Sequence, residues 1–204
     1  MKSSVIPVTL AVEDALSEAV LRALLRQSRN SYEVGPCYRR QGFGYLKKMI
    51  GGFNNAAKGT PFCVLTDLDK TECPPTLISE WLSQPRHPNL LLRVAVRAVE
   101  SWILAHHKAF SKLLGISPEM IPIDVDGIAD PKRFLIDLAR KSPNSGLRSD
   151  LAGPRGSLRK QGPDYNGRLI LFVREQWRPD VGRSRSPSLS RTMDALDEFN
   201  LSWA

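Results

Sequence analysis

Two aspartates stand one residue apart at the end of an apolar run and are the sharpest chemical signal in the chain. Asp67 and Asp69 follow the apolar residues 62–65. On a β-strand alternate side chains share a face, so both carboxylates are expected to point the same way. Two neighbouring negative charges repel each other unless something positive lies between them. The pair therefore predicts a bound cation.

Two further acids accompany another apolar run. Glu13 follows the run at residues 5–12, and Glu18 lies near the first turn of the helix expected after it. Mg²⁺ prefers hard oxygen ligands and is held by one or two carboxylates together with water and substrate phosphate. We therefore expect Mg²⁺, or Mn²⁺, to be held by Glu13, Asp67, Asp69 and Glu18. The alternative is a capped turn before a helix, with solvated acids.

The basic residues predict a polyanionic partner. The 204 residues carry a net charge of +8, with a pI of about 9.7. Basic proteins of this size often bind nucleic acid, and a cation among acids in a basic protein suggests phosphodiester chemistry. The candidate phosphate contacts lie in basic clusters, for which a solvated surface is the alternative: Lys47, Lys48, Arg159, Lys160, Arg183 and Arg185. The glycine-rich segment beside Lys47 lacks the G-K-[ST] ending of a P-loop, so no ATP site is expected there.

Glu100 is a further candidate, at the start of an expected helix. Its carboxylate could orient a metal-bound water or a basic side chain, whereas the alternative is an i, i+3 pair with Arg97 on a solvated face. Trp102 is interpreted as a core residue. His106 and His107 have no partner at metal-ligand spacing and are interpreted as surface or core residues.

The elements that position these acids alternate between strand and helix over the first ~115 residues. Strands are expected near residues 4–12, 31–34, 60–69 and 89–96, and helices near 14–28, 44–53, 75–84 and 97–115, with Asp14 as an N-cap. This alternation predicts an α/β fold with a mostly parallel sheet of about four strands flanked by helices. Ligand sites of such sheets lie at the carboxyl ends of the strands, where Glu13, Asp67 and Asp69 fall.

The second half of the chain changes character. A helix is expected at 131–141, a long polar and basic loop at 142–167, and two closing helices within 165–177 and 186–203. We expect a single domain, with a core at residues 1–115 and a helical C-terminal extension at 116–204 packed on it.

Several segments together resemble a known family. "VEDALSEAVLRALL", "GFNNAAKGTPFCVLTDLDKTECPP", "VRAVESWILAH", "DPKRFLIDLARKS", "GPDYNGRL" and "SPSLSRTMDAL" are similar to the Toprim-like domain of unknown function 4276 family, related to the Toprim domain of OLD nucleases. The resemblance implies a Toprim-like fold and a magnesium-dependent nuclease acting on nucleic acid, DNA in particular, in defence against phage or plasmids. It also implies an ABC-class ATPase as a separate partner.

The same resemblance assigns roles to the acids. Glu13 matches the catalytic glutamate that acts as general acid or base beside the metal, and Asp67 and Asp69 match the catalytic metal-binding pair. Glu18 matches the second acid of the first motif. Asp14 replaces the usual glycine, so either Glu13 or Asp14 takes the position at the strand end, and His106 replaces an acid of the family pattern.

Two other functions remain open. The "DLDKT" segment fits the first motif of haloacid dehalogenase-like phosphatases, with Asp67 as nucleophile and Asp69 as general acid. Against this, the motif follows some 60 residues of other elements, and the downstream acidic pair of that fold is missing. The third interpretation is a non-catalytic Toprim-like protein that binds nucleic acid or a partner protein.

The cysteines indicate the compartment. Cys37, Cys63 and Cys73 lack CxxC spacing, which argues against a zinc site. Free thiols are typical of a reducing environment, so we expect a cytoplasmic protein. No signal peptide and no apolar run of membrane-spanning length is recognised in the sequence. The oligomeric state is not predicted.

Overall fold

The chain forms two compact units. The computed structural model describes residues 5–39, 43–154, 156 and 160–202. One unit, here called the sheet unit, comprises Met1–Val96 and Arg191–Ala204, and the other, the helical unit, comprises Arg97–Ser190. The boundary near residue 190 falls within α10 (Pro187–Asp197). Each unit is described separately below.

The sheet unit contains a four-stranded parallel sheet. The strands lie in the order β2-β1-β3-β4, and each neighbouring pair runs in parallel: β1 (Ile6–Val12), β2 (Tyr32–Arg39), β3 (Phe62–Asp67) and β4 (Leu90–Ala95). The predicted fold class, α/β with a parallel sheet of about four strands, is confirmed, and this architecture is consistent with a Toprim-like fold.

The near-continuous apolar character of the inner strands explains why they run in parallel. Residues 62–66 are all buried, and so are residues 8–12. A strand covered on both faces lacks the alternation of a half-exposed strand, and crossover helices supply that cover in parallel sheets. The edge strand β2 instead exposes many of its residues, as its more polar sequence favours.

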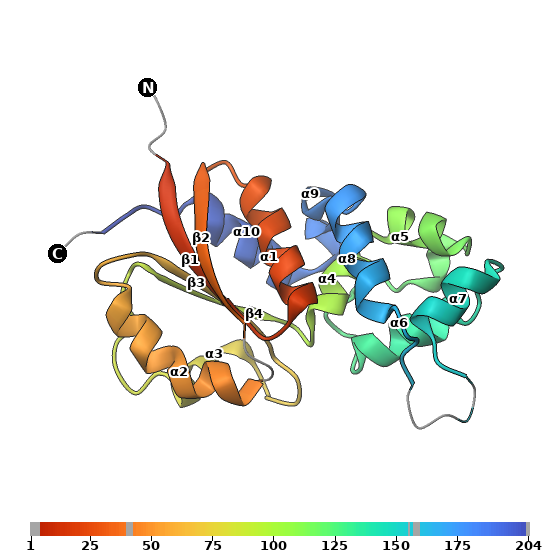
Figure 1. Cartoon of the computed structure of the whole chain (residues 1–204), viewed down its shortest axis with the longest axis horizontal. Helices are drawn as coiled ribbons and strands as arrows, with labels where there is room; N and C mark the ends of the chain where they lie inside the picture. Colours follow the sequence, from red (N-terminus) through yellow and green to blue (C-terminus); the bar gives the residue numbers. More distant parts are fainter. Residues whose placement is uncertain (1–4, 40–42, 155, 157–159, 203–204) are drawn as a thin grey trace. The chain divides into compact units, whose positions relative to one another are not determined.

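Helices cover the sheet in layers. In Figure 1, α1 (Ala15–Arg26) lies along one side of the sheet, while α2 (Phe43–Ala56) and α3 (Pro74–Trp81) lie on the other. The core between α2, α3 and the sheet includes Leu46, Ile50, Leu77, Val64 and Leu92. Glu13 directly follows β1 and Asp67 ends β3, so both lie at the carboxyl ends of these neighbouring strands.

The helical unit is built around large aromatic side chains. Trp102, Trp177, Phe110 and Phe172 are fully buried. The rings of Phe110 and Phe172 meet edge to face at 5.4 Å, and the Trp177 indole donates a hydrogen bond of 3.0 Å to the backbone oxygen of Trp102. The expected core position of Trp102 is therefore correct.

Short helices surround this core. In chain order they are α4 (Val99–Ala105), α5 (His107–Leu114), η1 (Pro118–Met120), α6 (Pro131–Ala139), α7 (Ser145–Leu151), α8 (Tyr165–Glu175), α9 (Pro179–Gly182) and η2 (Arg183–Arg185). Among the residues that the structure describes, no helix is long and apolar enough to span a bilayer.

Two details of this unit differ from the sequence prediction. The single helix expected at 97–115 is divided at His106, whose ψ of 56° leaves the helical range and whose Nδ1 accepts a hydrogen bond of 3.0 Å from the backbone N–H of Arg178. The expected loop at 142–167 contains α7, which Asn144 caps by accepting a hydrogen bond of 3.0 Å from the Leu147 N–H.

Candidate metal centre at the sheet edge

Glu13 extends from the end of β1 across to the end of β3. Its Oε1 accepts hydrogen bonds from the Thr66 hydroxyl at 2.5 Å and from the Asp67 backbone N–H at 3.1 Å. The two strands are direct neighbours, with Val12 opposite Leu65, so their carboxyl ends meet at one edge. Because Thr66 is buried, this contact fixes the orientation of the Glu13 carboxylate.

Asp67 and Asp69 lie next to this contact but in different local structures. Asp67 is the last residue of β3 and is half-buried. Asp69 is exposed in the following turn, where its φ of 50° places it in the left-handed region. The turn is closed by a hydrogen bond of 3.0 Å from the Thr71 N–H to the Leu68 oxygen. Because β3 ends at Asp67, the alternation of side chains along a strand, which predicted that both carboxylates share a face, does not extend to Asp69.

The surroundings of Glu13 favour its protonated form. Burial is the largest cause that raises the pKa of Glu13 above its usual value of 4.5, and the charges of Asp69 and Asp14 raise it further. The hydrogen bonds from Thr66 and from the Asp67 backbone act in the opposite direction, because they stabilise the carboxylate. A cation bound near these carboxylates would lower the pKa of Glu13, because its charge offsets the repulsion from Asp69 and Asp14.

Asp14 and Glu18 are engaged in other contacts. Asp14 caps α1, and its Oδ1 accepts a hydrogen bond of 2.8 Å from the Ser17 N–H, as predicted. The contact at the end of β3 is thus made by Glu13. Glu18 Oε1 lies 2.8 Å from Arg22 Nε, and Glu18 Oε2 lies 3.5 Å from Arg39 Nη1. The structure therefore places Glu18 with basic side chains at the start of α1.

The acidic side chains at this edge offer the kind of ligand atom that a hard divalent cation prefers. Glu13, Asp67 and Asp69 offer carboxylate oxygens, which Mg²⁺ and Mn²⁺ prefer. Within the described part of the chain, no group of three or more Asp, Glu, His or Cys residues is arranged to hold a metal ion. Mg²⁺ needs only one or two protein carboxylates because water and phosphate fill its other positions.

Glu100 lies in the helical unit in a buried, paired position. It is 2% exposed, its Oε1 accepts a hydrogen bond of 3.1 Å from the Tyr165 hydroxyl, and Lys132 Nζ lies 3.7 Å from the same oxygen. This burial rules out the solvated-face alternative for Glu100. The sequence prediction missed Lys132 and Tyr165 as partners, although both fall in segments that carry the family resemblance.

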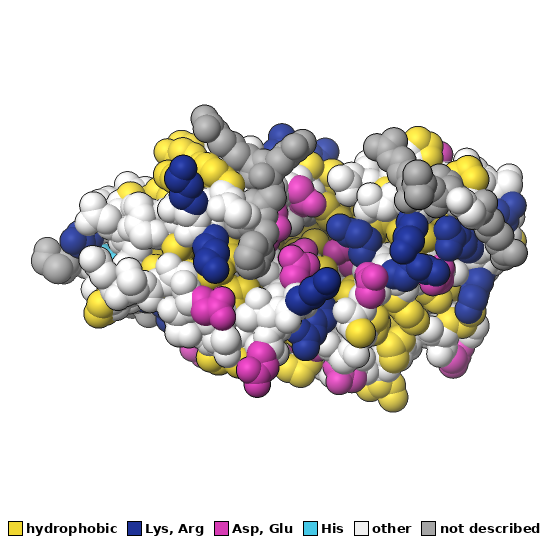
Figure 2. Space-filling model, turned by 90° about the horizontal axis from the view of Figure 1, so that it is seen from below, with side chains coloured by type: hydrophobic (Ala, Val, Ile, Leu, Met, Phe, Trp, Pro, Cys, Tyr) yellow, Lys and Arg dark blue, Asp and Glu magenta, His cyan; other side chains and the backbone are white. Residues whose placement is uncertain are grey.

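The predicted phosphate contacts belong to both units. Lys47 lies 3.9 Å from Glu80 on the exposed surface of the sheet unit, and Lys48 and Lys160 are exposed. Arg183 and Arg185 are half-buried in the helical unit, and burial lowers the pKa of Arg185. Arg159 lies outside the described residues. In the view of Figure 2, Lys and Arg side chains lie interspersed with Asp and Glu side chains.

Comparisons with protein-family models, with curated proteins and with solved structures found no match to this chain. The function is therefore argued from the geometry and the electrostatics of the site.

Proposed function

We propose that this protein hydrolyses phosphodiester bonds of nucleic acid with the help of Mg²⁺ or Mn²⁺ at the carboxyl edge of the sheet. The observation that supports this most is the Glu13 carboxylate, whose Oε1 is held 3.1 Å from the Asp67 N–H. The ends of two neighbouring parallel strands thereby bring Glu13 and Asp67 together, with Asp69 two residues further along. The likeness to Toprim-like sequences agrees with this assignment.

Each acid has a role in this proposal. Asp67 and Asp69 supply oxygen ligands to the cation, and Glu13 transfers a proton at the reacting phosphate, for which a raised pKa is suited. The bound cation would polarise a phosphoryl oxygen and lower the pKa of a water. Glu18 would have to leave Arg22 and Arg39 to join the site, so the proposal depends on the other three acids.

The substrate class follows from charge. A net charge of +8 attracts polyanions, and the phosphate backbone supplies most of the affinity in such complexes. DNA is the substrate that the family resemblance implies, and an ABC-class ATPase partner and a role in defence belong to the same proposal. The three cysteines are free thiols, which suits a cytoplasmic setting.

Nicking of supercoiled plasmid tests the activity. We expect the wild-type protein to nick DNA with Mg²⁺ or Mn²⁺ and not with EDTA, and Asp67→Asn and Glu13→Gln each to lose at least about 100-fold in rate, as removal of a catalytic electrostatic group does. Glu33→Gln removes an exposed carboxylate from β2 and is the matched control, expected to keep full activity. Nicking that survives in both site variants would contradict the proposal.

The second candidate is a non-catalytic nucleic-acid-binding protein. It is favoured by the finding that no group of three metal-ligating side chains is assembled among the described residues. Under this alternative, DNA binds with a steep salt dependence, and no divalent cation promotes nicking. Release of phosphate from a small phosphomonoester, with DNA left intact, would instead favour the haloacid dehalogenase-like chemistry.

A further inference from the structure

Two arginines share the Glu18 carboxylate at the carboxyl end of β2. Arg22 Nε lies 2.8 Å from Glu18 Oε1, and Arg39 Nη1 lies 3.5 Å from Glu18 Oε2. Arg39 ends β2 and lies opposite Val12, the residue before Glu13. In Figure 1, β1 and β2 run side by side toward this edge. Neighbouring strands are about 4.8 Å apart, so this cluster lies beside the proposed cation site.

The alternation of side chains along β2 directs Arg39 toward α1. Cys37 and Arg39 are two residues apart on the strand and therefore share a face, and both interact with Glu18 of α1. Tyr38 points to the other side of the sheet, where its ring lies 5.6 Å from the ring of Phe53 in α2. The position of Arg39 thus follows from the strand register and from its carboxylate partner.

The cluster carries one more positive charge than negative. Arg22 and Glu18 neutralise each other as an i, i+4 pair, and within the described part of the chain no second acid pairs with Arg22 or Arg39. Burial raises the pKa of the Cys37 thiol to about 11, so the thiol stays neutral at pH 7. The charge of Arg39 is therefore left to attract an anion.

The guanidinium of Arg39 is accessible to a ligand. Its side chain is 47% exposed, and that of Arg22 is 37% exposed. The ion pair of Arg39 with Glu18, at 3.5 Å, is longer than the usual N–H···O hydrogen bond of about 2.7–3.2 Å. It orients the guanidinium without occupying its five N–H donors, and a planar guanidinium fork matches the oxygens of a phosphate.

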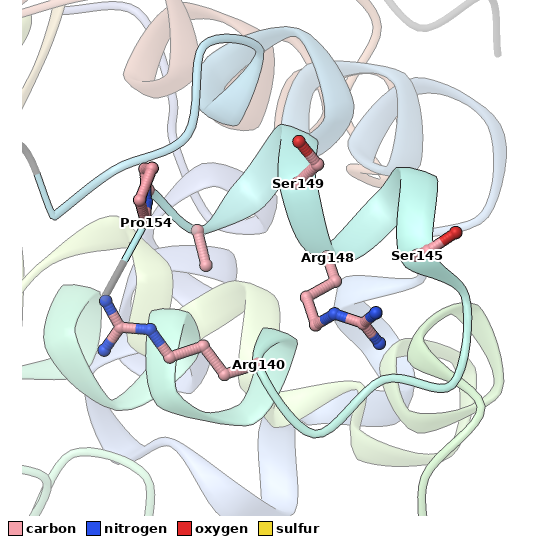
Figure 3. Close-up of a pocket in the computed structure, with 7 residues that line it drawn as sticks. Arg140, Ser145, Arg148, Ser149 and Pro154 are labelled. Carbon is pink, nitrogen blue, oxygen red and sulfur yellow. The ribbon is translucent and has the colours of Figure 1, made fainter.

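A pocket in the helical unit also has two arginines, but these do not converge. The pocket has a volume of about 510 Å³, and Arg140 and Arg148 are among its lining residues. Figure 3 shows their guanidinium groups pointing away from each other. At the end of β2, by contrast, one carboxylate contacts both guanidinium groups and so brings them together.

We propose that Arg39 binds a backbone phosphate of the nucleic acid next to the phosphate at the cation, and that Glu18, paired with Arg22, positions Arg39 for this contact. A nucleic acid strand carries a phosphate about every 3.4 Å along its axis, so a strand bound at the end of β1 presents further phosphates near the end of β2. Glu18 is then a positioning residue and not a cation ligand. This inference rests on the proposed function, because it takes nucleic acid as the substrate.

A binding titration in EDTA tests the phosphate contact without cation and without hydrolysis. The probe is a fluorescently labelled double-stranded DNA oligonucleotide, whose anisotropy is measured at several salt concentrations with the wild type, Arg39→Gln and Arg26→Gln. Arg26→Gln is the matched control, because it removes the same charge from an exposed position in the last turn of α1, at the other end of the helix from Glu18.

We expect Arg39→Gln to bind DNA about tenfold more weakly, the effect of losing a charge-assisted hydrogen bond. Its salt slope should be smaller in magnitude by about 0.9, the value for one phosphate contact. Arg26→Gln should change the affinity about twofold or less. Unchanged affinity in Arg39→Gln, equal weakening in Arg26→Gln, or no DNA binding by the wild type would overturn the proposal.

Glu18→Gln, alone and combined with Arg39→Gln, tests the positioning role. If Glu18 acts through Arg39, the fold-change in DNA affinity caused by Glu18→Gln should differ at least about threefold between the wild-type and Arg39→Gln backgrounds, because the effects of coupled residues are not additive. The same fold-change in both backgrounds would show that Glu18 does not act through Arg39.

The result is separable from the test of hydrolysis. Weakened DNA binding by Arg39→Gln, with no nicking by the wild type, would keep the phosphate contact and reject the nuclease. Nicking by the wild type, with unchanged affinity in Arg39→Gln, would keep the nuclease and reject the contact. If circular dichroism shows that Arg39→Gln is unfolded, Arg39→Lys takes its place, since it keeps the charge but not the planar fork. Weaker binding by Arg39→Lys supports the contact, and wild-type affinity contradicts it.

Discussion

Glu13 is the residue on which the account of the sheet edge depends, and its surroundings lead to a prediction about pH. Folding raises the pKa of Glu13 above its usual value of 4.5. Between pH 4.5 and the folded-state pKa, the folded protein therefore binds more protons than the unfolded chain. The stability that Glu13 contributes is therefore fully present below about pH 4.5 and is lost as pH rises through the folded-state pKa.

Glu13→Gln tests this sign. The amide oxygen of glutamine can still accept the hydrogen bonds of Thr66 and Asp67, but the side chain carries no charge. We expect the variant to be at least as stable as the wild type at pH 7 and to lose the part of the pH dependence that Glu13 causes. Urea unfolding at pH 5 and pH 7 measures the difference, and an identical pH dependence in both proteins would show that Glu13 has no raised pKa.

At the residue scale, the sequence predicted the meeting of two acids and not the contacts of the others. Glu13 and Asp67 follow apolar runs that become adjacent parallel strands, so their proximity follows from the fold class. Glu18 is directed by Arg22 and Arg39, and Glu100 by Tyr165 and Lys132. These partners come largely from other elements, and no local pattern reports which side chains the packing will bring together.

The helix α1, which follows Glu13, begins with the N-cap Asp14, and this cap contributes to stability but not to the contact that Glu13 makes. Asp14 accepts a hydrogen bond of 2.8 Å from the Ser17 N–H at the start of α1. Asp14→Ala is expected to lower the free energy of unfolding by about 0.5–2 kcal/mol. It should leave cation binding in place, because Glu13 makes the contact at the end of β3. Chemical denaturation and metal titration of this variant measure the two effects, and loss of cation binding in a folded Asp14→Ala protein would place Asp14 in the site.

At the scale of elements, the pattern of apolar residues predicted the long strands and helices, whereas a short helix and a break within a helix were not predicted. The apolar runs of β1, β3 and β4 and the stripe of α1 are long enough to be recognised, whereas α7 is short and lies among Gly, Pro and Ser. The sequence "SPNS" before α7 contained a usable signal, since Asn is a preferred N-cap. The division at His106 depends on a hydrogen bond from Arg178, which a local window does not include.

The charge of the whole molecule predicts how any complex with nucleic acid responds to salt. With a net charge of +8, the logarithm of the affinity for double-stranded DNA should fall linearly with the logarithm of salt concentration. The slope is about −0.9 per phosphate contacted. Fluorescence anisotropy at a series of salt concentrations measures this slope, and an affinity independent of salt would contradict binding to nucleic acid.

The composition of the chain is enough to support this prediction. The division of the chain into two units, with a boundary inside α10, depends on packing, which composition does not indicate.

The most direct test of the central claim is calorimetric titration of Mn²⁺ into the metal-free protein and into Asp67→Asn. We expect Mn²⁺ to bind the wild type saturably. The affinity should fall at least about tenfold, or ~1.4 kcal/mol, in Asp67→Asn, which loses one carboxylate, and should be unchanged in Glu33→Gln. Mn²⁺ binding of the same strength in wild type and Asp67→Asn, or no saturable binding to either, would contradict a cation site at the ends of β1 and β3.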